Sequence, residues 1–447
     1  MVDGVQYNSL AFIYVFLPLF LVIYYLGGQR YRNGILFFGS LIFYALSSSG
    51  NYWWVAILIG VTFLSYYAAL SLAKAGRGWL LGMYLFCLTC FLAFFKLYQG
   101  GKYLPAGMSF YLFQIAACLI DVYRGRIFPE KSFGCYMNQI IMFPKLLSGP
   151  LMNPEKLRNQ VKFCSPAVEN IHEGLQKFLL GLGMKVLLAN RLGGIWSQAS
   201  ITGYTNISTP YAWIALISWA MQLYFDFYGY SLMAIGVGKM IGFDLPKNFL
   251  DPYASKSVSE FYRRWHATLG AWFKEYLYIP LGGNRKGTIR TLFNLAVVWL
   301  FTGLWHGVGG NYLLWAAILY LLIVNERLWF GKVLNRSKVL CHIYVIVAIL
   351  LSWVPFAVPN LDQMMVFFAK LFGIGSAALN PQDYTTLFPM YTGLLTSGVI
   401  LATPIPGMLW KKIRHSTFGD ILMFILFWAV IYYLCTSAQD PFMYFQY

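Results

Sequence analysis

The feature that most constrains this 447-residue chain is a series of apolar runs, each long enough to cross a lipid bilayer. Hydrophobic residues make up 59% of the chain and charged residues only 11%, whereas a soluble protein carries about 25% charged residues. We therefore predict an all-α, polytopic membrane protein with about eleven or twelve transmembrane helices, together with re-entrant and interfacial helices.

Basic residues gather in alternate loops between these runs. The 33 Lys and Arg residues against 16 Asp and Glu residues give a net charge of +17. No basic run exceeds three residues, so loops facing a negative cytoplasmic leaflet explain the charge better than nucleic acid does. The alternation predicts a multi-pass protein of the cell membrane, in contact with membrane lipid and with both termini outside the cytoplasm. Three uncharged loops, predicted to be exported, are Ser47–Asn51, Ser197–Pro210 and Gly307–Asn311.

The first apolar run, Leu10–Leu26, lacks a basic leader and a cleavage site, so it is predicted to be a retained spanning helix. Cys87 and Cys90 form a lone CxxC inside an apolar run, which favours membrane packing over metal or disulfide chemistry. The chain shows no internal repeat and no linker, so residues 1–447 are expected to form one membrane domain.

One apolar segment is unsuited to forming an uninterrupted transmembrane helix. Gly134–Pro150 is interrupted by Pro144, Ser148, Gly149 and Pro150. Irregular backbone at membrane depth persists only when it is buried in protein or faces water. We predict a re-entrant or broken element here.

Most candidate chemistry lies in residues 251–310. Ser257 and Glu260 have capping-box spacing, which predicts that a helix begins there. On a helical wheel its apolar face is aromatic and its other face is charged, which is typical of a helix at a membrane surface. The aromatic face holds Phe261, Trp265, Leu269, Trp272 and Tyr276, and the charged face holds Arg263, Arg264, Lys274 and Glu275. A second, apolar helix, Thr291–Trp305, ends at His306.

At this segment the sequence resembles a known family. RRWHATLGAWFKEYLYIPLGGNRKG, followed by FTGLWHG, is similar to the signature of the membrane-bound O-acyltransferases, in the alginate O-acetyltransferase-like branch that acetylates exported polysaccharides. Further matches lie at Leu104–Gly125, Phe143–Pro150 and Leu223–Ser231. The resemblance spans nearly the whole chain. It implies transfer of an acyl group, expected to be acetyl, from a cytoplasmic thioester such as acetyl-CoA or an acyl carrier to an exported polysaccharide, through an extracytoplasmic SGNH-type partner.

His306 is the principal catalytic candidate. Histidine titrates in the range needed to take a hydroxyl proton, and an ionisable residue near the membrane interior indicates function. The alternative is a helix-terminal histidine bonded to a carbonyl. The LWHG resemblance implies a general base at His306 and substrate contact by Trp305. The remaining histidines outside the two motifs, expected in loops or at interfaces, are His172, His342 and His415.

His266 matches the second recurrent polar site of the family, so the resemblance implies that it orients substrate or shapes a tunnel; a structural role at the interface is the alternative. Arg263, Arg264 and Lys274 could attract the phosphates of a donor such as coenzyme A, although cytoplasmic topology alone would also produce them. Asp226 lies in an apolar run and needs either a basic partner or contact with substrate.

Other functions fit parts of the pattern. A transporter or flippase would also use an ionisable residue within a helix, but inverted repeats are lacking. A polytopic glycosyltransferase would need acids in an exported loop, and the uncharged loops offer none. D-alanyl transfer to teichoic acid stays open within the family. No metal or bound cofactor is expected.

The tail, residues 437–447, is predicted to be exported. Its end, DPFMYFQY, resembles the aromatic ending of this branch. A phenol is a hydroxyl that could carry an acyl group from His306 to the partner, and Tyr444 is the favoured position, with Tyr447 the other phenol. The alternative is an aromatic belt that anchors the last helix.

Overall fold

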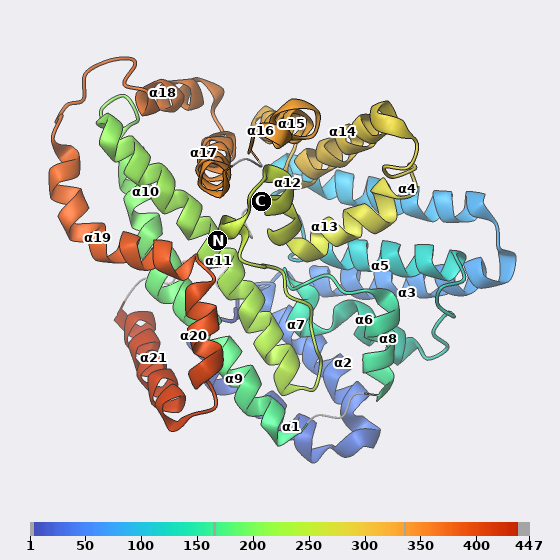
Figure 1. The fold of residues 1–447 in the computed structure, drawn as a ribbon. Coiled ribbons are helices and arrows are strands. Elements are labelled where there is room, and N and C mark those ends of the chain that lie inside the picture. Colours follow the sequence, from blue (N-terminus) through green and yellow to red (C-terminus); the bar gives the residue numbers. More distant parts are fainter. Residues whose placement is uncertain (1–3, 164–166, 335–336, 437–447) are drawn as a thin grey trace. The chain divides into compact units, whose positions relative to one another are not determined.

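The computed structural model describes residues 4–163, 167–334 and 337–436. Throughout these residues the regular elements are helices, which confirms the all-α prediction (Figure 1). Contacts group the chain into two compact units. The first contains the residues up to Leu182 together with Gly229–Lys247, and the second contains Gly183–Tyr228 and Asn248–Tyr433.

The first unit is built from the N-terminal helices, in which α5 packs against α3 and α4, and α6 packs against α2. Its elements are η1 (Phe12–Phe16), α1 (Leu17–Leu26), α2 (Gly28–Ser47), α3 (Trp53–Ala75), α4 (Gly78–Leu97), η2 (Tyr98–Gly101), α5 (Met108–Tyr123), α6 (Phe133–Ile141), α7 (Phe143–Leu146), α8 (Pro154–Phe163) and α9 (Val168–Gly183).

The second unit carries the predicted catalytic segment, and in it α15 packs against α14 and α17. The long helix α11 (Thr209–Met240) contributes to both units. The other elements are η3 (Met184–Ala189), α10 (Asn190–Thr202), η4 (Pro252–Ala254), α12 (Val258–Arg264), α13 (Ala267–Phe273), η5 (Lys274–Tyr278), α14 (Gly287–His306), α15 (Gly310–Asn325), η6 (Glu326–Phe330), α16 (Gly331–Leu334), α17 (Lys338–Ala357), α18 (Leu361–Leu371), α19 (Asp383–Leu401), α20 (Ile405–Ile413) and α21 (Thr417–Thr436).

Among the described residues, 7 helical segments are long and apolar enough to cross a membrane, or up to 8 if the bent pair of α19 and α20 forms one span. The protein is thus a multi-pass membrane protein, although this count is below the eleven or twelve crossings expected. The difference arises because two further apolar helices, Phe12–Leu26 and Met108–Tyr123, are shorter, and because α11 carries buried polar groups such as Ser218, Asp226 and Ser231.

The segment Gly134–Pro150 is a broken element, as predicted. Helix α6 ends at Ile141 and α7 is a single turn, and most of the segment is buried within the first unit. Side chains supply partners to its irregular backbone: the Phe143 N–H donates to Ser40 Oγ at 3.1 Å, and the Phe143 carbonyl accepts from the Tyr7 hydroxyl at 2.8 Å. These bonds explain how the break is tolerated in the interior.

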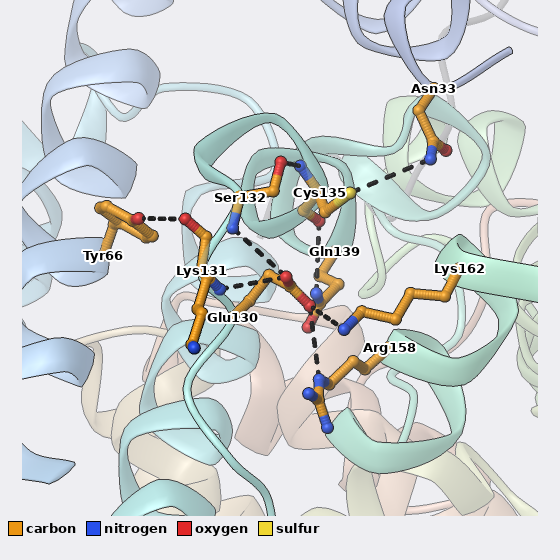
Figure 2. Close-up of polar contacts among 9 residues, drawn as sticks. All are labelled: Asn33, Tyr66, Glu130, Lys131, Ser132, Cys135, Gln139, Arg158 and Lys162. Atoms are coloured by element: carbon orange, nitrogen blue, oxygen red, sulfur yellow. Dashed lines mark hydrogen bonds and ion pairs between the residues drawn. The ribbon is translucent and has the colours of Figure 1, made fainter. Parts of the chain in front are cut away.

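A buried carboxylate organises the segment between α5 and α8 (Figure 2). Glu130 accepts the backbone N–H groups of Lys131 and Ser132 at 3.0 and 3.3 Å. It also pairs with Arg158 and Lys162 of α8 at 3.4 and 3.0 Å. Glu130 thereby fixes α8 to the start of α6.

The helix predicted to run from Ser257 through Tyr276 is interrupted. The N-cap prediction is confirmed, because Ser257 Oγ accepts the Glu260 N–H at 3.0 Å. However, α12 ends at Arg264, and α13 begins only after His266, which has left-handed backbone angles (φ 47°, ψ 48°). The single helical wheel was therefore wrong, because bonds to Asn248 replace the helical continuation: the Ala267 N–H donates to the Asn248 carbonyl at 2.8 Å.

Candidate active site

A cavity of about 800 Å³ lies inside the second unit. Its walls come from α12, α13, η5, α14, α15, η6, α16 and α17, with one residue of α11. His266 and His306, which the sequence places on different helices, both line this cavity. The tertiary structure therefore brings together the two histidines on which the sequence interpretation depends.

His306 is the last residue of α14 and is surrounded by aromatic rings. The ring centroids of Trp315 and Phe356 each lie 5.0 Å from that of His306, both at steep interplanar angles. Trp305 is nearer, at 4.5 Å, and Tyr312 stacks at 6.4 Å. These rings give the imidazole an apolar and largely rigid surrounding, which limits its orientations.

His266 lies at the interruption between α12 and α13 and is buried. Its Nδ1 lies 2.9 Å from Asn248 Oδ1, and its ring meets the Phe227 ring edge-on at a centroid distance of 4.7 Å. Burial lowers the pKa of His266 to about 3. The ring is therefore neutral at physiological pH, because desolvation disfavours the imidazolium form.

Trp305 lies beside both histidines. Its ring centroid is 4.5 Å from that of His306 and 6.1 Å from that of His266. Trp305 is not one of the cavity-lining residues. It therefore packs against the two imidazoles and can hold their relative positions.

Two of the three predicted donor-binding cations reach the cavity, namely Arg263 and Lys274. Arg264 does not line it and instead pairs with Glu260 at 2.6 Å. Two cations that the sequence interpretation missed, Lys256 and Arg327, also line the cavity. Their positions depend on how α12 packs against the α15–η6 region, which no local pattern reports.

Asp226 is buried in the second unit and pairs with Lys185 of η3 at 2.5 Å. Neither residue lines the cavity. Of the two interpretations left open for this acid, the structure provides the basic partner. The pair joins η3 to α11 at a site where a single charge would be costly.

Glu326, at the start of η6, was not singled out from the sequence. It is buried, lines the cavity, and accepts the N–H groups of Val258 and Ser259 at 2.5 and 3.2 Å. An acid directly after the apolar run of α15 was a usable signal, because charges in or next to a span need partners.

The remaining predicted groups lie elsewhere. His342 Nδ1 is 3.0 Å from the Ser255 carbonyl, and His172 Nε2 is 3.3 Å from Gln176 Nε2. Within the described ranges no three His, Cys, Asp or Glu side chains gather as a metal site. Tyr444 and Tyr447 fall outside the described residues.

Comparison with known proteins identifies the family of this chain. Residues 66–361 match the MBOAT, membrane-bound O-acyltransferase family. A probable alginate O-acetylase of Pseudomonas putida is 32% identical over 99% of this chain and 100% of its own length. A peptidoglycan O-acetyltransferase of Helicobacter pylori is 30% identical over 83% of this chain and 81% of its own. A teichoic acid D-alanyltransferase of Bacillus subtilis is 23% identical over 47% of this chain and 55% of its own. The chain belongs to the membrane-bound O-acyltransferase family, and it is a multi-pass membrane enzyme of the O-acyltransferase class.

Proposed function

We propose that this enzyme transfers acetyl groups from a thioester donor to hydroxyls of an exported cell-surface polysaccharide. The observation that carries the proposal is one cavity lined by both histidines and by four cations. The acetyl group is favoured because two relatives that each cover most of the chain are named as an O-acetylase and an O-acetyltransferase. The D-alanyltransferase is less similar and covers about half of the chain, so D-alanyl transfer is not favoured.

In the proposed reaction His306 is the general base. It takes the proton of the attacking hydroxyl as the oxygen bonds to the thioester carbonyl carbon. The tetrahedral intermediate then collapses, the C–S bond breaks, and the thiolate leaves with the proton returned by His306. The products are an oxygen ester and a free thiol, so no further reactant is needed.

The donor is proposed to be acetyl-CoA or an acetylated carrier thioester, both of which carry phosphates. Lys256, Arg263, Lys274 and Arg327 supply the cationic groups that phosphates favour. Lys256, Arg263 and Lys274 lie in the basic segment between Lys239 and Arg290, and Arg327 lies on η6 in a second basic cluster. The charge pattern predicts that both segments face the cytoplasm. We therefore place donor entry at the cytoplasmic side.

The acetyl group must then reach a polymer outside the membrane. We propose that an SGNH-type extracytoplasmic partner receives it, with Tyr444 of the exported tail as the intermediate carrier. An aryl ester is a more activated donor than an alkyl ester, so the onward transfer to a serine or sugar hydroxyl is downhill.

The test replaces His306 with Gln in the full chain and measures transfer from radiolabelled acetyl-CoA to polymer in native membranes. We expect a loss of about 10²–10⁴-fold in rate, which is typical of removing a general base. His415→Gln is the matched control, because His415 is exposed and does not line the cavity. Wild-type rates in a normally expressed His306→Gln protein would overturn the mechanism.

A further inference from the structure

Asn248 is a buried residue whose side-chain oxygen lies within hydrogen-bond distance of three groups. Asn248 Oδ1 lies 2.9 Å from Thr268 Oγ1, 3.4 Å from the Thr268 backbone nitrogen and 2.9 Å from His266 Nδ1. Its backbone carbonyl also accepts the Ala267 N–H at 2.8 Å. Asn248 thus caps α13 from a distant segment and stabilises the left-handed backbone of His266.

These contacts determine which nitrogen of His266 carries the proton. A backbone N–H can only donate, so the Asn248 atom that faces the Thr268 N–H must be the amide oxygen. His266 Nδ1 faces the same oxygen and must therefore donate as well. In the neutral ring, the lone pair then lies on Nε2, and His266 can offer a hydrogen-bond acceptor to a molecule in the cavity.

The two cavity histidines are consequently suited to different tasks. Burial keeps the pKa of His266 near 3, which makes this ring a weak base but a stable neutral acceptor. His266 follows Arg263 by three residues and precedes Lys274 by eight, and both cations line the cavity. The arm that joins the phosphates to the sulfur in a pantetheine thioester carries amide N–H groups, which need acceptors when they enter a buried site.

We propose that Asn248 is a positioning residue that holds His266 as a neutral hydrogen-bond acceptor for an amide N–H of the thioester donor's arm. This inference rests on the proposed function, because it assumes that the donor occupies the cavity. It assigns the proton-transfer step to His306 and donor recognition to His266.

A double-mutant cycle in the full-length protein tests the coupling, with acetyl-CoA as the varied substrate. Asn248→Ala is expected to raise the KM for acetyl-CoA about tenfold or more while lowering kcat less, because the imidazole loses its fixed tautomer. In a His266→Gln background the same change should have little further effect on KM. An equal effect in both backgrounds would show a purely structural role and overturn the proposal.

Asn248→Asp provides a second readout. The aspartate keeps an acceptor for all three donors, but its charge favours the imidazolium form of His266, whose Nε2 can only donate. The KM for acetyl-CoA should therefore rise at low pH and recover as pH increases through the new pKa of His266. A KM profile that follows the wild-type profile at every pH would contradict the proposed acceptor role. Titratable groups on the surrounding elements, which are common to both proteins, include Tyr224, Asp226, Tyr228, Asp251, Tyr253, Glu260, Tyr262, Arg263, Arg264, Lys274 and His306.

Asn360→Asp is the matched control, since Asn360 is an exposed N-cap whose Oδ1 accepts the Gln363 N–H at 2.9 Å, and aspartate caps equally well. If an Asn248 variant loses turnover, thermal stabilisation by CoA reports donor binding without chemistry. The two proposals can be tested separately. A fully active His306→Gln enzyme would contradict the general-base role of His306. Independent effects of the Asn248 and His266 substitutions on KM would contradict only the acceptor role of His266.

Discussion

Glu326 accepts the backbone N–H of Val258 at 2.5 Å, across 68 positions of sequence. Together with the bond to the Ser259 N–H at 3.2 Å, this carboxylate satisfies the first two N–H groups of α12. Negative charge is favourable at a helix N-terminus, where these groups have no helical partner. The helix that carries Arg263 into the cavity is thereby anchored to η6.

We expect Glu326→Ala to destabilise the protein by about 1–3 kcal/mol, because two buried donors lose their acceptor. Displacement of α12 should also raise the KM for the donor. Glu326→Gln keeps one carbonyl oxygen and should be milder. Thermal unfolding in detergent and donor kinetics measure the two effects, with the exposed Glu155→Ala as control. An unchanged unfolding temperature in Glu326→Ala would show that the anchor is dispensable.

We expect the effects of substitutions at Lys185 and Asp226 on stability to be strongly non-additive. Removing one partner leaves a buried charge, so Asp226→Leu and Lys185→Met should each cost about 3–5 kcal/mol. The double variant Lys185→Met with Asp226→Leu should be closer to wild type, since both side chains are almost fully buried at 3% and 1% exposure. Unfolding of the four proteins in one detergent tests this expectation. If the stability lost in the double variant equals the sum of the losses in the two single variants, the two side chains do not act as a simple ion pair.

Because of Glu130, we expect the first unit to lose stability at acidic pH. Burial alone would raise its pKa, but hydrogen bonds from Lys162, the Ser132 N–H and Arg158 outweigh burial and hold the pKa below its ordinary value of 4.5. Because the pKa is lower in the folded state, the stabilisation is present above about pH 4.5 and is lost as pH falls through the folded pKa.

Glu130→Gln should therefore be less stable than wild type at neutral pH and should show a weaker loss on acidification. Unfolding temperatures between neutral and acidic pH measure the difference. The exposed Glu169→Gln serves as control. Parallel pH profiles for Glu130→Gln and wild type would contradict the assignment.

Alternating basic loops predict the orientation of the chain. In a background from which the exposed Cys87, Cys90 and Cys435 are removed, Lys286→Cys should react with an impermeant maleimide only from the cytoplasmic side. Ser200→Cys should react only from outside. Both positions are exposed in the structure, so a label can reach them. The reverse pattern would move donor entry to the outer face.

The proposed acyl carrier is tested by Tyr444→Phe, which keeps the aromatic ring and removes only the hydroxyl. We expect loss of polymer acetylation at normal protein level. Tyr447→Phe alone is the matched control and should retain activity. Unchanged acetylation in the Tyr444→Phe, Tyr447→Phe double variant would leave only an aromatic anchor.

The membrane class, the helical fold and the two histidine motifs could be predicted from the amino-acid sequence alone. These features are local: a run of about 20 apolar residues demands a helix in lipid, and a histidine at its end can be identified without a partner. The N-cap at Ser257 and the break within Gly134–Pro150 were predicted for the same reason, since the relevant residues are neighbours in the chain.

How these parts form a site depends on contacts between distant segments of the chain. The interruption at His266 depends on Asn248, 18 positions away, and the partner of Asp226 is Lys185, 41 positions away. Glu326 reaches α12 from another helix. Hydrogen bonds and ion pairs of this kind are chosen by packing, because a buried polar group bonds to whatever the fold places beside it. For that reason the helical wheel predicted one continuous helix, whereas the structure has two, α12 and α13. His266 lies between them and lines the cavity.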